Sequence, residues 1–339
     1  MTLRPFEERD YPRLLAIRNA AYPDHAGSEA ELRHEDASWE TDRYFRRRLM
    51  LEDGEGLVVG FGELRHMPEQ FHPDKYALFL AVDPAYRSRG YGSALFDALG
   101  ETLTERGALL VRSDAQESRP ESLRFLQHRG FREMQRAWES RLDVRAFDPA
   151  PFAGAEARVA GAGITITTLE EERRREGDGV LRAVYELDRD VSRDMPMIDP
   201  ITDTSFEHFL KGVLDSPNVL PPAWFIARAG ATYAGVSSLW KSQELPDVLY
   251  QGITGVRREY RRRGIALALK LRGLGYARAH GVREIRTWNN TINRAMLSIN
   301  ERWASSSSRP GSSWSSPCGR RRPAGRWSEA SAAFLNGTT

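Results

Sequence analysis

Two short segments rich in arginine and glycine have the composition of anion-binding loops. The first is Arg87-Ser88-Arg89-Gly90-Tyr91-Gly92 and the second is Arg261-Arg262-Arg263-Gly264-Ile265-Ala266. Each follows an apolar, strand-like run and precedes a predicted helix, so its backbone N–H groups can turn inward at the positive end of that helix. Arginines there could add charge-assisted hydrogen bonds to phosphate oxygens. The pattern predicts a pyrophosphate-binding loop, although a turn that opens a helix could need glycine for structural reasons alone.

The two segments belong to an internal repeat with a constant offset. Val82 matches Val256, which lies 174 residues later, and Gly107 still matches Gly281 at the same offset. The other identities are Tyr86 with Tyr260, Arg87 with Arg261 and Gly90 with Gly264. A match without gaps across a strand, a loop and a helix predicts two copies of one domain.

The repeat predicts the domain organisation. We expect an amino-terminal domain over residues 1–145 and a carboxy-terminal domain over residues 164–302. Residues 146–163 between them are rich in proline, glycine and alanine, which predicts a linker.

Within each copy the pattern reads strand, helical region, strands, motif, helix, strand and helix, which predicts an α+β fold around a mixed sheet. In the first copy we expect a helix over residues 42–51, with Arg46-Arg47-Arg48 on its solvated face. Residues 56–64 and 76–82 are apolar runs typical of strands.

The first loop resembles the acyl-CoA-binding signature of the GNAT N-acetyltransferases. Val82-Asp83-Pro84 precedes Arg87-x-x-Gly90-x-Gly92, as in that family, and the resemblance extends over both copies to about Arg302. It implies two GNAT-type domains, each a mostly antiparallel, splayed sheet flanked by helices, with acetyl-CoA as cofactor. The cofactor-binding positions that it implies are Val82, Arg87, Ser88, Arg89, Gly90, Tyr91, Gly92 and Ser93 in the first copy, and Val256, Arg261, Arg262, Arg263, Gly264, Ile265, Ala266, Leu267 and Asn300 in the second.

The catalytic residues are not identified by the sequence. Many family members carry a tyrosine that protonates the leaving thiolate four residues before a glycine, whereas this chain has Leu126 before Gly130 and, at the matching position, Asn300. The Asn300 amide could bond the pantetheine arm or the thioester, or it could simply lie on a helix surface. Candidates for the base are Glu63 or Asp74 in the first copy and Glu244 or Asp247 in the second, and each could equally be an exposed carboxylate.

Residues 303–339 depart from the repeat. The offset predicts glycine and phenylalanine at positions occupied by Ala304 and Ser305, and the segment holds ten serines, five arginines and the only cysteine. That composition predicts a disordered tail. A reading-frame shift is the alternative, because the codons of Trp303-Ala304 read one base earlier give leucine, valine or methionine followed by glycine. The next triplet then permits phenylalanine.

The charge distribution argues against nucleic-acid binding. The formal net charge is +2, but five arginines and one glutamate after residue 302 contribute +4, so residues 1–302 carry −2. A single cysteine, Cys318, allows neither an internal disulfide nor a thiolate cluster, and we expect no metal. No apolar run has the length of a signal core or a membrane span, so we expect a cytoplasmic protein that binds no membrane.

The resemblance to the GNAT family implies an N-acetyltransferase that moves an acetyl group from acetyl-CoA to a primary amine of a small molecule, and we expect a monomer or homodimer. The tandem arrangement also resembles that of mycothiol synthase, which implies a cysteinyl amine as one candidate acceptor. Two alternatives remain open: a non-catalytic acyl-CoA-binding or sensing module, suggested by the missing tyrosine, and an arginine-based nucleic-acid binder.

Overall fold

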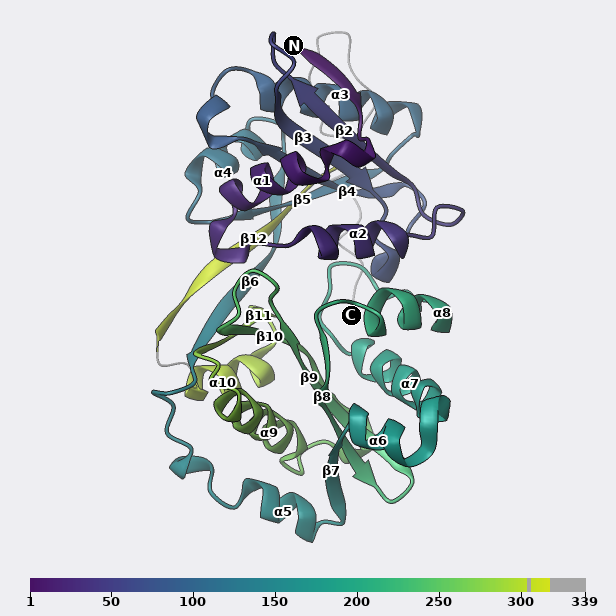
Figure 1. The fold of residues 1–339 in the computed structure, drawn as a ribbon, viewed down its shortest axis with the longest axis vertical. Coiled ribbons are helices and arrows are strands. Elements are labelled where there is room, and N and C mark those ends of the chain that lie inside the picture. The colour runs from purple at the N-terminus through teal and green to yellow at the C-terminus, as the bar shows by residue number, and fades with distance from the viewer. Residues whose placement is uncertain (304–305, 318–339) are drawn as a thin grey trace, which may run out of the picture. The chain divides into compact units, whose positions relative to one another are not determined.

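The computed structural model, drawn in Figure 1, describes residues 1–303 and 306–317. The chain divides into two compact units, one containing residues 1–137 and the segment that starts at Pro310, the other residues 138–309. The division falls inside strand β6 (Arg132–Asp143), which contributes its first part to unit 1 and its second part to unit 2. Each unit holds a mixed sheet flanked by helices, so the α+β class is confirmed.

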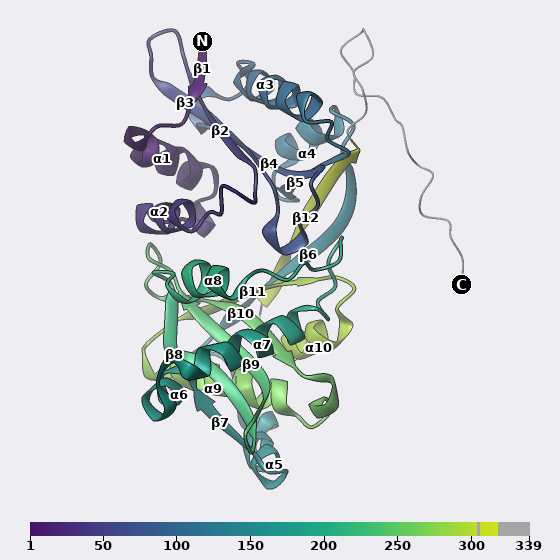
Figure 2. The same ribbon diagram turned by 90° about the vertical axis from the view of Figure 1, so that its right-hand side faces the viewer.

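Unit 1 carries its strands in the order β1-β2-β3-β4-β5-β12-β6. Its strands are β1 (Thr2–Pro5), β2 (Arg46–Glu52), β3 (Val58–Arg65), β4 (Lys75–Val82), β5 (Leu110–Gln116), β12 (Ser306–Pro317) and β6, and its helices are α1 (Tyr11–Ala21), α2 (Glu29–Ala37), α3 (Tyr91–Glu105) and α4 (Pro120–Gln127). Figure 2 shows α1 and α2 on one face of this sheet and α3 and α4 on the other. Leu95, Leu99 and Leu103, four residues apart on α3, are buried against the sheet.

The strands β4 and β5 run parallel but are paired only at their first residues. The register joins Lys75 to Leu110, Tyr76 to Val111 and Ala77 to Arg112, and no pair follows. From Leu78 to Val82, β4 is paired with β3 on its other side alone. The two strands therefore part toward the end of β4, which is the splay that the sequence predicts.

The helix expected over residues 42–51 is wrong, because this segment holds strand β2. Leu49, Met50 and Leu51 are all buried, as in a strand that is covered on both faces. Arg47 donates to Thr102 on α3, whereas Arg46 and Arg48 reach Asp36 on α2. The period of two sends successive arginines to opposite faces, so the run is not the solvated face of a helix.

Unit 2 repeats the plan of unit 1 with the strand order β6-β11-β10-β9-β8-β7. Its further strands are β7 (Ile164–Thr168), β8 (Val219–Ala229), β9 (Thr232–Lys241), β10 (Val248–Val256) and β11 (Glu284–Asn290), and its helices are α5 (Ala155–Gly161), α6 (Leu169–Glu176), α7 (Val180–Ser192), α8 (Phe206–His208), a π-helix over Phe209–Leu214, α9 (Ile265–Ala279) and α10 (Arg294–Trp303). The strands β10 and β11 also pair at three positions, from Val248 with Glu284 to Tyr250 with Arg286, and then part.

The offset of 174 residues holds in three dimensions. The short 3-10 turn at Pro84–Tyr86 recurs at Arg258–Tyr260, α3 recurs as α9, and β5 recurs as β11 with the same bounds after the shift. The unusual positive φ of 62° at Ser88 recurs at Arg262, also at 62°. The backbone of the loop is thus the same in both copies.

The segment expected to be a linker is folded. Residues 155–161 form α5, and Val159 and Phe147 are buried in the core of unit 2. Its proline and glycine content marks the turns around this short helix.

Part of the carboxy-terminal tail is a strand. Residues 306–317 form β12, which pairs antiparallel with β5 from Gly311 with Gln116 to Pro317 with Leu110. The disorder expected over residues 303–339 therefore does not extend to this strand, because backbone hydrogen bonds to β5 require no apolar side chains. Residues 304–305 and 318–339 lie outside the described residues, and the reading-frame shift remains a hypothesis.

A glycine on β10 allows close packing of α7. A Cβ atom added at Gly255 would lie 2.5 Å from Cβ of Val191. We predict that Gly255→Ala lowers the free energy of unfolding by about 1–3 kcal/mol through overpacking. Gly275→Ala on helix α9 is the control, because a Cβ atom added there would meet nothing within 4 Å. It should raise the free energy of unfolding by about 0.5–1 kcal/mol. Urea denaturation would measure both, and equal effects would contradict the packing argument.

Candidate functional site

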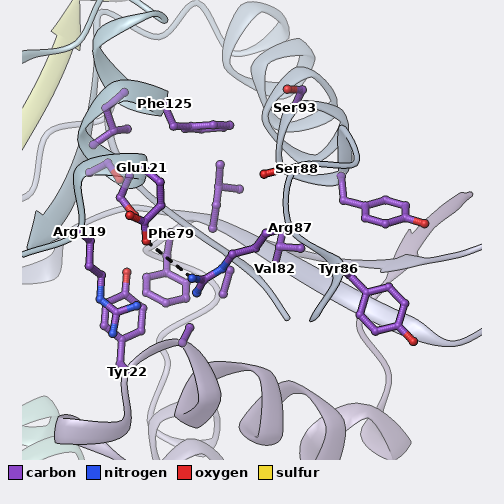
Figure 3. Close-up of a pocket in the computed structure, with 18 of the residues that line it drawn as sticks. Tyr22, Phe79, Val82, Tyr86, Arg87, Ser88, Ser93, Arg119, Glu121 and Phe125 are labelled. Carbon is purple, nitrogen blue, oxygen red and sulfur yellow. Dashed lines mark ion pairs between the residues drawn. The ribbon is translucent and has the colours of Figure 1, made fainter. Parts of the chain in front are cut away.

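A pocket of about 320 Å³ lies beside the first arginine-glycine loop (Figure 3). Its wall comes from the end of α1, the parted segments of β4 and β5, the loop, and the first turns of α3 and α4. Of the cofactor-binding positions expected in the first copy, those that line the pocket are Val82, Arg87, Ser88, Gly90, Tyr91, Gly92 and Ser93. The fold thus brings seven of eight expected residues together at one cavity.

The loop is held by a short chain of polar contacts. The Asp83 carboxylate accepts the Ala85 N–H at 3.0 Å and a hydrogen bond from Arg13 on α1 at 2.7 Å. Gly90 then takes φ of +85° and caps the start of α3. The first N–H groups of α3 have no partner within the helix, so they are donors available to an anion at this end of the pocket.

Glycine leaves room for a ligand at this loop. A Cβ atom at Gly92 would lie 3.3 Å from Cε2 of Phe125 and 3.8 Å from Cγ2 of Val82, and one at Gly90 would meet nothing within 4 Å. The first position requires a small residue, and the second borders open space. The loop therefore leaves space for an anionic group beside the start of α3.

The two arginines of the loop behave differently. Arg87 lines the pocket and pairs with Glu121 at 3.6 Å (Figure 3). Arg89 donates to the Ala85 carbonyl at 3.3 Å and lies over the ring of Tyr86, outside the pocket lining. Of these two loop arginines, Arg87 is consequently the one whose guanidinium can reach a phosphate in the pocket.

Several residues of the pocket were not expected from the sequence. They are Tyr22, Phe79, Ser113, Asp114, Arg119, Glu121 and Phe125. Tyr22 packs against Phe79 with ring centroids 5.9 Å apart, and the Arg119 guanidinium lies 4.8 Å from the Tyr22 ring. Burial raises the pKa of the Tyr22 phenol above its usual range. These residues come from four distant segments, and no local spacing in the sequence relates them.

The phenol of Tyr22 is an uncommitted proton donor. Its hydroxyl has no hydrogen-bond partner in residues 1–303 or 306–317. Leu126, which stands where many relatives carry tyrosine, also lines this pocket. Tyr22 therefore offers an O–H group to the cavity in which Leu126 offers none.

None of the four candidate bases lines this pocket. Glu63 is buried, pairs with Arg48 at 2.6 Å and with Arg65 at 3.4 Å, and faces a different cavity. The Arg283 guanidinium, 2.7 Å from Asp247, lowers the pKa of that carboxyl. Asp74 and Glu244 are also absent from the lining. The acids that do line the pocket are Asp114 and Glu121.

The second loop has the same backbone and different electrostatics. Arg263 donates to the Glu259 carbonyl and lies over Tyr260, as Arg89 does over Tyr86. Arg261, the counterpart of Arg87, is instead ion-paired with Asp194, which follows α7.

Asp194 also pairs with Arg258, and the hydrogen bonds from Arg258 and Arg261 lower the pKa of its carboxyl to about 2. A phosphate at Arg261 would have to compete with this carboxylate. The arginine at the position of Arg87 is therefore held by a close carboxylate at the second loop.

Most of the remaining positions expected in the second copy lie in the core of unit 2 or at the start of α9. Gly264 has φ of +80° and caps α9, Ile265 is buried, and Ala266 and Leu267 pack against the same core as Val256. Arg262 is exposed at the tip of the loop.

Asn300 is buried and not on a helix surface, so that alternative is wrong. Lys270 on α9 donates to its Oδ1 at 2.8 Å, and the two side chains line a cavity of about 30 Å³. Because an ammonium can only donate, the contact fixes the amide with Nδ2 turned away, and Nδ2 has no partner among the described residues.

The amino-terminal sequence matches a known family. Residues 11–131 match the model of the acetyltransferase (GNAT) family. No curated protein matches the chain.

Solved structures share the fold over both units. A GCN5-related N-acetyltransferase from Sphaerobacter thermophilus superposes with a TM-score of 0.66 at 20% identity, covering 93% of this chain and 95% of that one. A tandem GNAT protein from the clavulanic acid biosynthesis pathway gives 0.67 at 18% identity, covering 93% and 98%. At these identities the likeness establishes the fold.

Family and fold together define the class. Residues 11–131 belong to the GNAT acetyltransferase family, and the chain as a whole has the tandem GNAT fold. The chain therefore carries a GNAT acetyltransferase domain at residues 11–131 within a tandem GNAT fold.

Two further features concern the described residues alone. No helix among residues 1–303 is long and apolar enough to cross a membrane. No group of three or more histidine, cysteine, aspartate or glutamate side chains in the described part of the chain could hold a metal ion.

The buried Lys270 should make stability depend on pH. Burial lowers the pKa of its ammonium to about 8, below the ~10.4 of an unfolded chain. Between these values the unfolded state binds more protons, so the free energy of unfolding should rise with pH, by roughly 3 kcal/mol in all. We predict that Lys270→Met removes this rise. Urea midpoints from pH 7 to 10.5 would measure it, with the exposed Lys241→Met as control. An unchanged slope in Lys270→Met would contradict the assignment.

Proposed function

We propose that unit 1 binds acetyl-CoA in the pocket of Figure 3 and transfers its acetyl group to a primary amine of a small molecule. The observation that carries this proposal is the coincidence of the anion-binding loop with the parted strands β4 and β5 at one cavity. The cofactor would supply an activated thioester carbonyl. We expect the protein to act in the cytoplasm, as a monomer or homodimer.

The loop would hold the pyrophosphate. The N–H groups at Gly90 to Ser93 lie at the positive end of α3, and Arg87 adds a charge on the same side of the pocket. Val82 and Phe125 flank Gly92, so apolar contact surrounds the polar end of the site.

The free backbone edge of β4 would bind the arm of the cofactor. Beyond Ala77, β4 has no partner on the β5 side, and its residues from Phe79 to Val82 line the pocket. Backbone N–H and C=O groups in a partly buried cleft need hydrogen-bond partners. An amide-containing chain laid along β4 would provide them in the manner of an added strand.

The acid and base are assigned from the lining. Tyr22 would protonate the leaving thiolate, because its hydroxyl is uncommitted and its ring lines the pocket. Asp114, whose carboxylate lines the same pocket, would accept the proton of the attacking amine directly or through water.

A non-catalytic role is favoured for unit 2 alone. Asp194 holds Arg261, the counterpart of Arg87, in an ion pair at the second loop, and a carboxylate held there opposes a phosphate. We infer that unit 2 binds acyl-CoA more weakly than unit 1 and that the chemistry belongs to unit 1.

The proton donor can be tested with one hydroxyl. We predict that Tyr22→Phe lowers kcat about a hundredfold and leaves acetyl-CoA affinity unchanged. Tyr44→Phe is the control, because the Tyr44 hydroxyl is buried, unpaired and outside the pocket. The rate of CoA release at saturating substrates would measure kcat. Full activity in Tyr22→Phe would show that Tyr22 is not the proton donor.

The cofactor site can be tested at the loop. We predict that Gly90→Asp weakens acetyl-CoA binding by roughly ten- to a thousandfold, since a like charge about 4 Å from a phosphate costs ~1–4 kcal/mol. Gly107→Asp is the matched control, because Gly107 also has positive φ, its Cβ would meet nothing within 4 Å, and it follows α3 at the far end. Calorimetric titration would compare the two, and equal affinities would reject the site.

The activity itself is tested by following CoA release with a panel of amines. Turnover with any primary amine that is lost in Gly90→Asp and kept in Gly107→Asp would support acetyl transfer. Cofactor binding without turnover across the panel would instead favour the sensing module.

A further inference from the structure

Unit 1 contains a second cavity, of about 130 Å³, on the face of the sheet that carries α1 and α2. This volume is well above the ~10–15 Å³ that one water needs. Its lining combines four apolar side chains with five charged ones: Leu14, Leu32, Phe61 and Phe79, and Arg18, Glu35, Arg48, Glu63 and Arg65. A cavity with charged walls is unusual for a core, and its polar groups call for an explanation.

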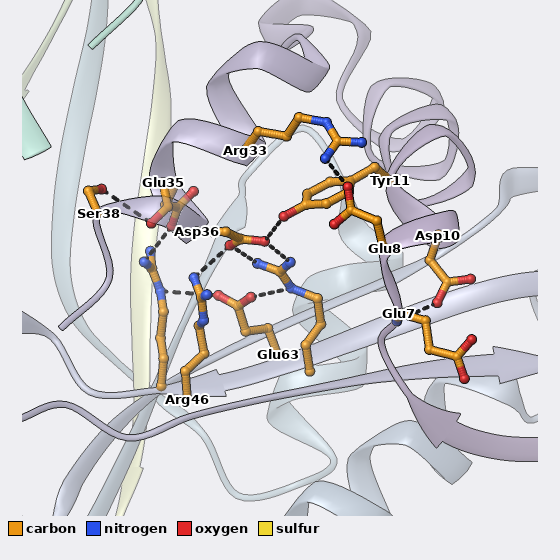
Figure 4. A network of polar contacts seen from close by, with 12 residues as sticks. Glu7, Glu8, Asp10, Tyr11, Arg33, Glu35, Asp36, Ser38, Arg46 and Glu63 are labelled. Carbon is orange, nitrogen blue, oxygen red and sulfur yellow. Dashed lines mark hydrogen bonds and ion pairs between the residues drawn. The ribbon is translucent and has the colours of Figure 1, made fainter. Parts of the chain in front are cut away.

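Most of these charges neutralise one another in the network of Figure 4. Arg48 donates twice to Asp36, at 2.9 and 3.0 Å, and once to Glu63 at 2.6 Å. Arg65 joins Glu35 at 2.7 Å to Glu63 at 3.4 Å.

Two further contacts complete the network. Arg46 pairs with Asp36 at 2.7 Å, and the Tyr11 hydroxyl donates to the same carboxylate at 2.6 Å. Three arginines thus face three carboxylates, which leaves the network without net charge and makes it a rigid wall.

Arg18 stands apart from this network. It lies on α1, lines the cavity and is only partly exposed, yet its guanidinium has no hydrogen bond or ion pair with any described residue. The acid across Gly27 is Glu31, whose carboxylate accepts the Ser28 N–H as a cap of α2. A guanidinium has five N–H donors. Among the described residues that line the cavity, Arg18 is the one cation whose N–H donors are all free to bind a ligand.

The cavity adjoins the proposed acetyl-CoA pocket. Helix α1 contributes Leu14 and Arg18 to the cavity and, one turn further on, Ala21 and Tyr22 to the pocket. Phe79 on β4 lines both. Phe79 therefore forms part of the wall of both spaces, and the Tyr22 ring packs against it.

We propose that this cavity is the subsite for the far end of the acceptor amine and that Arg18 binds a carboxylate of that acceptor. The acceptor class is then an amino acid or another small primary amine that carries a carboxylate. This assignment rests on the proposed function of unit 1. The planar fork of Arg18 matches a carboxylate bidentately, while Glu35 and Glu63 are held by arginines and do not oppose the anion as free charges.

The experiment compares two diamines that differ by a carboxylate, L-ornithine and putrescine, as acceptors with saturating acetyl-CoA. The wild-type protein should favour ornithine in kcat/KM by at least about tenfold, since hydrogen bonds to charged groups are the stronger ones. Arg18→Gln should abolish this preference through KM, and Arg18→Lys should keep part of it. Arg9→Gln is the control, because Arg9 is exposed and lines neither space. Equal use of both diamines by the wild type, or an unchanged preference in Arg18→Gln, would overturn the proposal.

A binding measurement separates this proposal from the proposed function. Calorimetric titration with glutarate in the presence of CoA should show binding to the wild type and Arg9→Gln, and a loss of at least about tenfold in Arg18→Gln. That result would support the carboxylate subsite even if no amine released CoA, in which case acetyl transfer alone would fail. Absence of glutarate binding, equal binding by Arg18→Gln, or tighter binding of inorganic phosphate than glutarate at Arg18 would overturn the subsite.

Discussion

The parting of β4 from β5 after three residue pairs is the constraint on which the rest of unit 1 depends. Up to Ala77 the backbones of the two strands are hydrogen-bonded to each other. Beyond Ala77 the edge of β4 that faces β5 has no backbone pairing. A strand that is buried in the middle of a sheet cannot leave its N–H and C=O groups unpaired without cost. The unpaired backbone groups of β4 therefore need hydrogen-bond partners close to the positive, N-terminal end of α3.

The elements around this opening are arranged to keep it open. The loop before α3 turns on Gly90 and is tied to α1 through Asp83 and Arg13, and Gly92 lets Phe125 of α4 approach closely. The helices on the two faces therefore meet at the loop and define one pocket. Core packing of Leu95, Leu99 and Leu103 fixes α3 against the sheet, so the donors at its start have a defined direction.

The two loops have the same backbone conformation but different side-chain contacts. Both loops share a left-handed residue in third position before the helix, a capping glycine and an arginine stacked on a tyrosine. Their ion pairs differ, because Asp194 reaches Arg261 in unit 2 while Arg87 in unit 1 faces the pocket with a longer pair to Glu121. The two loops thus share a backbone shape and differ in the surroundings of the corresponding arginine.

The network of arginines and carboxylates on the α1 and α2 face of unit 1 lines the second cavity. An apolar side chain in place of Arg48 or Glu63 would leave the remaining buried charges without their partners. The bonded arginines and carboxylates hold the cavity open, since each satisfies the others only in this geometry. A preformed polar cavity next to the cleft is the consequence.

The amino-acid sequence by itself determined the class of fold, the duplication and the anion-binding loops. These rest on local patterns, namely glycines at fixed places before a helix, apolar runs, and a constant offset of 174 residues. The same local reasoning failed at residues 42–51, where the arginines of β2 resembled a solvated helix because their acidic partners on α2 and β3 are distant in the chain. The two candidate bases of the first copy, Glu63 and Asp74, also lie outside the lining of the pocket in unit 1.

Only the tertiary structure decided which of the predicted residues act together and what else joins them. Tyr22, Asp114 and Arg119 meet Arg87 through contacts between α1, β5 and α4, and Asn300 became a buried partner of Lys270 through the packing of α10 on α9. The physical reason is the range of the interactions. Capping, turns and periodicity act over a few residues and can be read from the chain, whereas burial and ion pairing depend on neighbours that folding alone brings close.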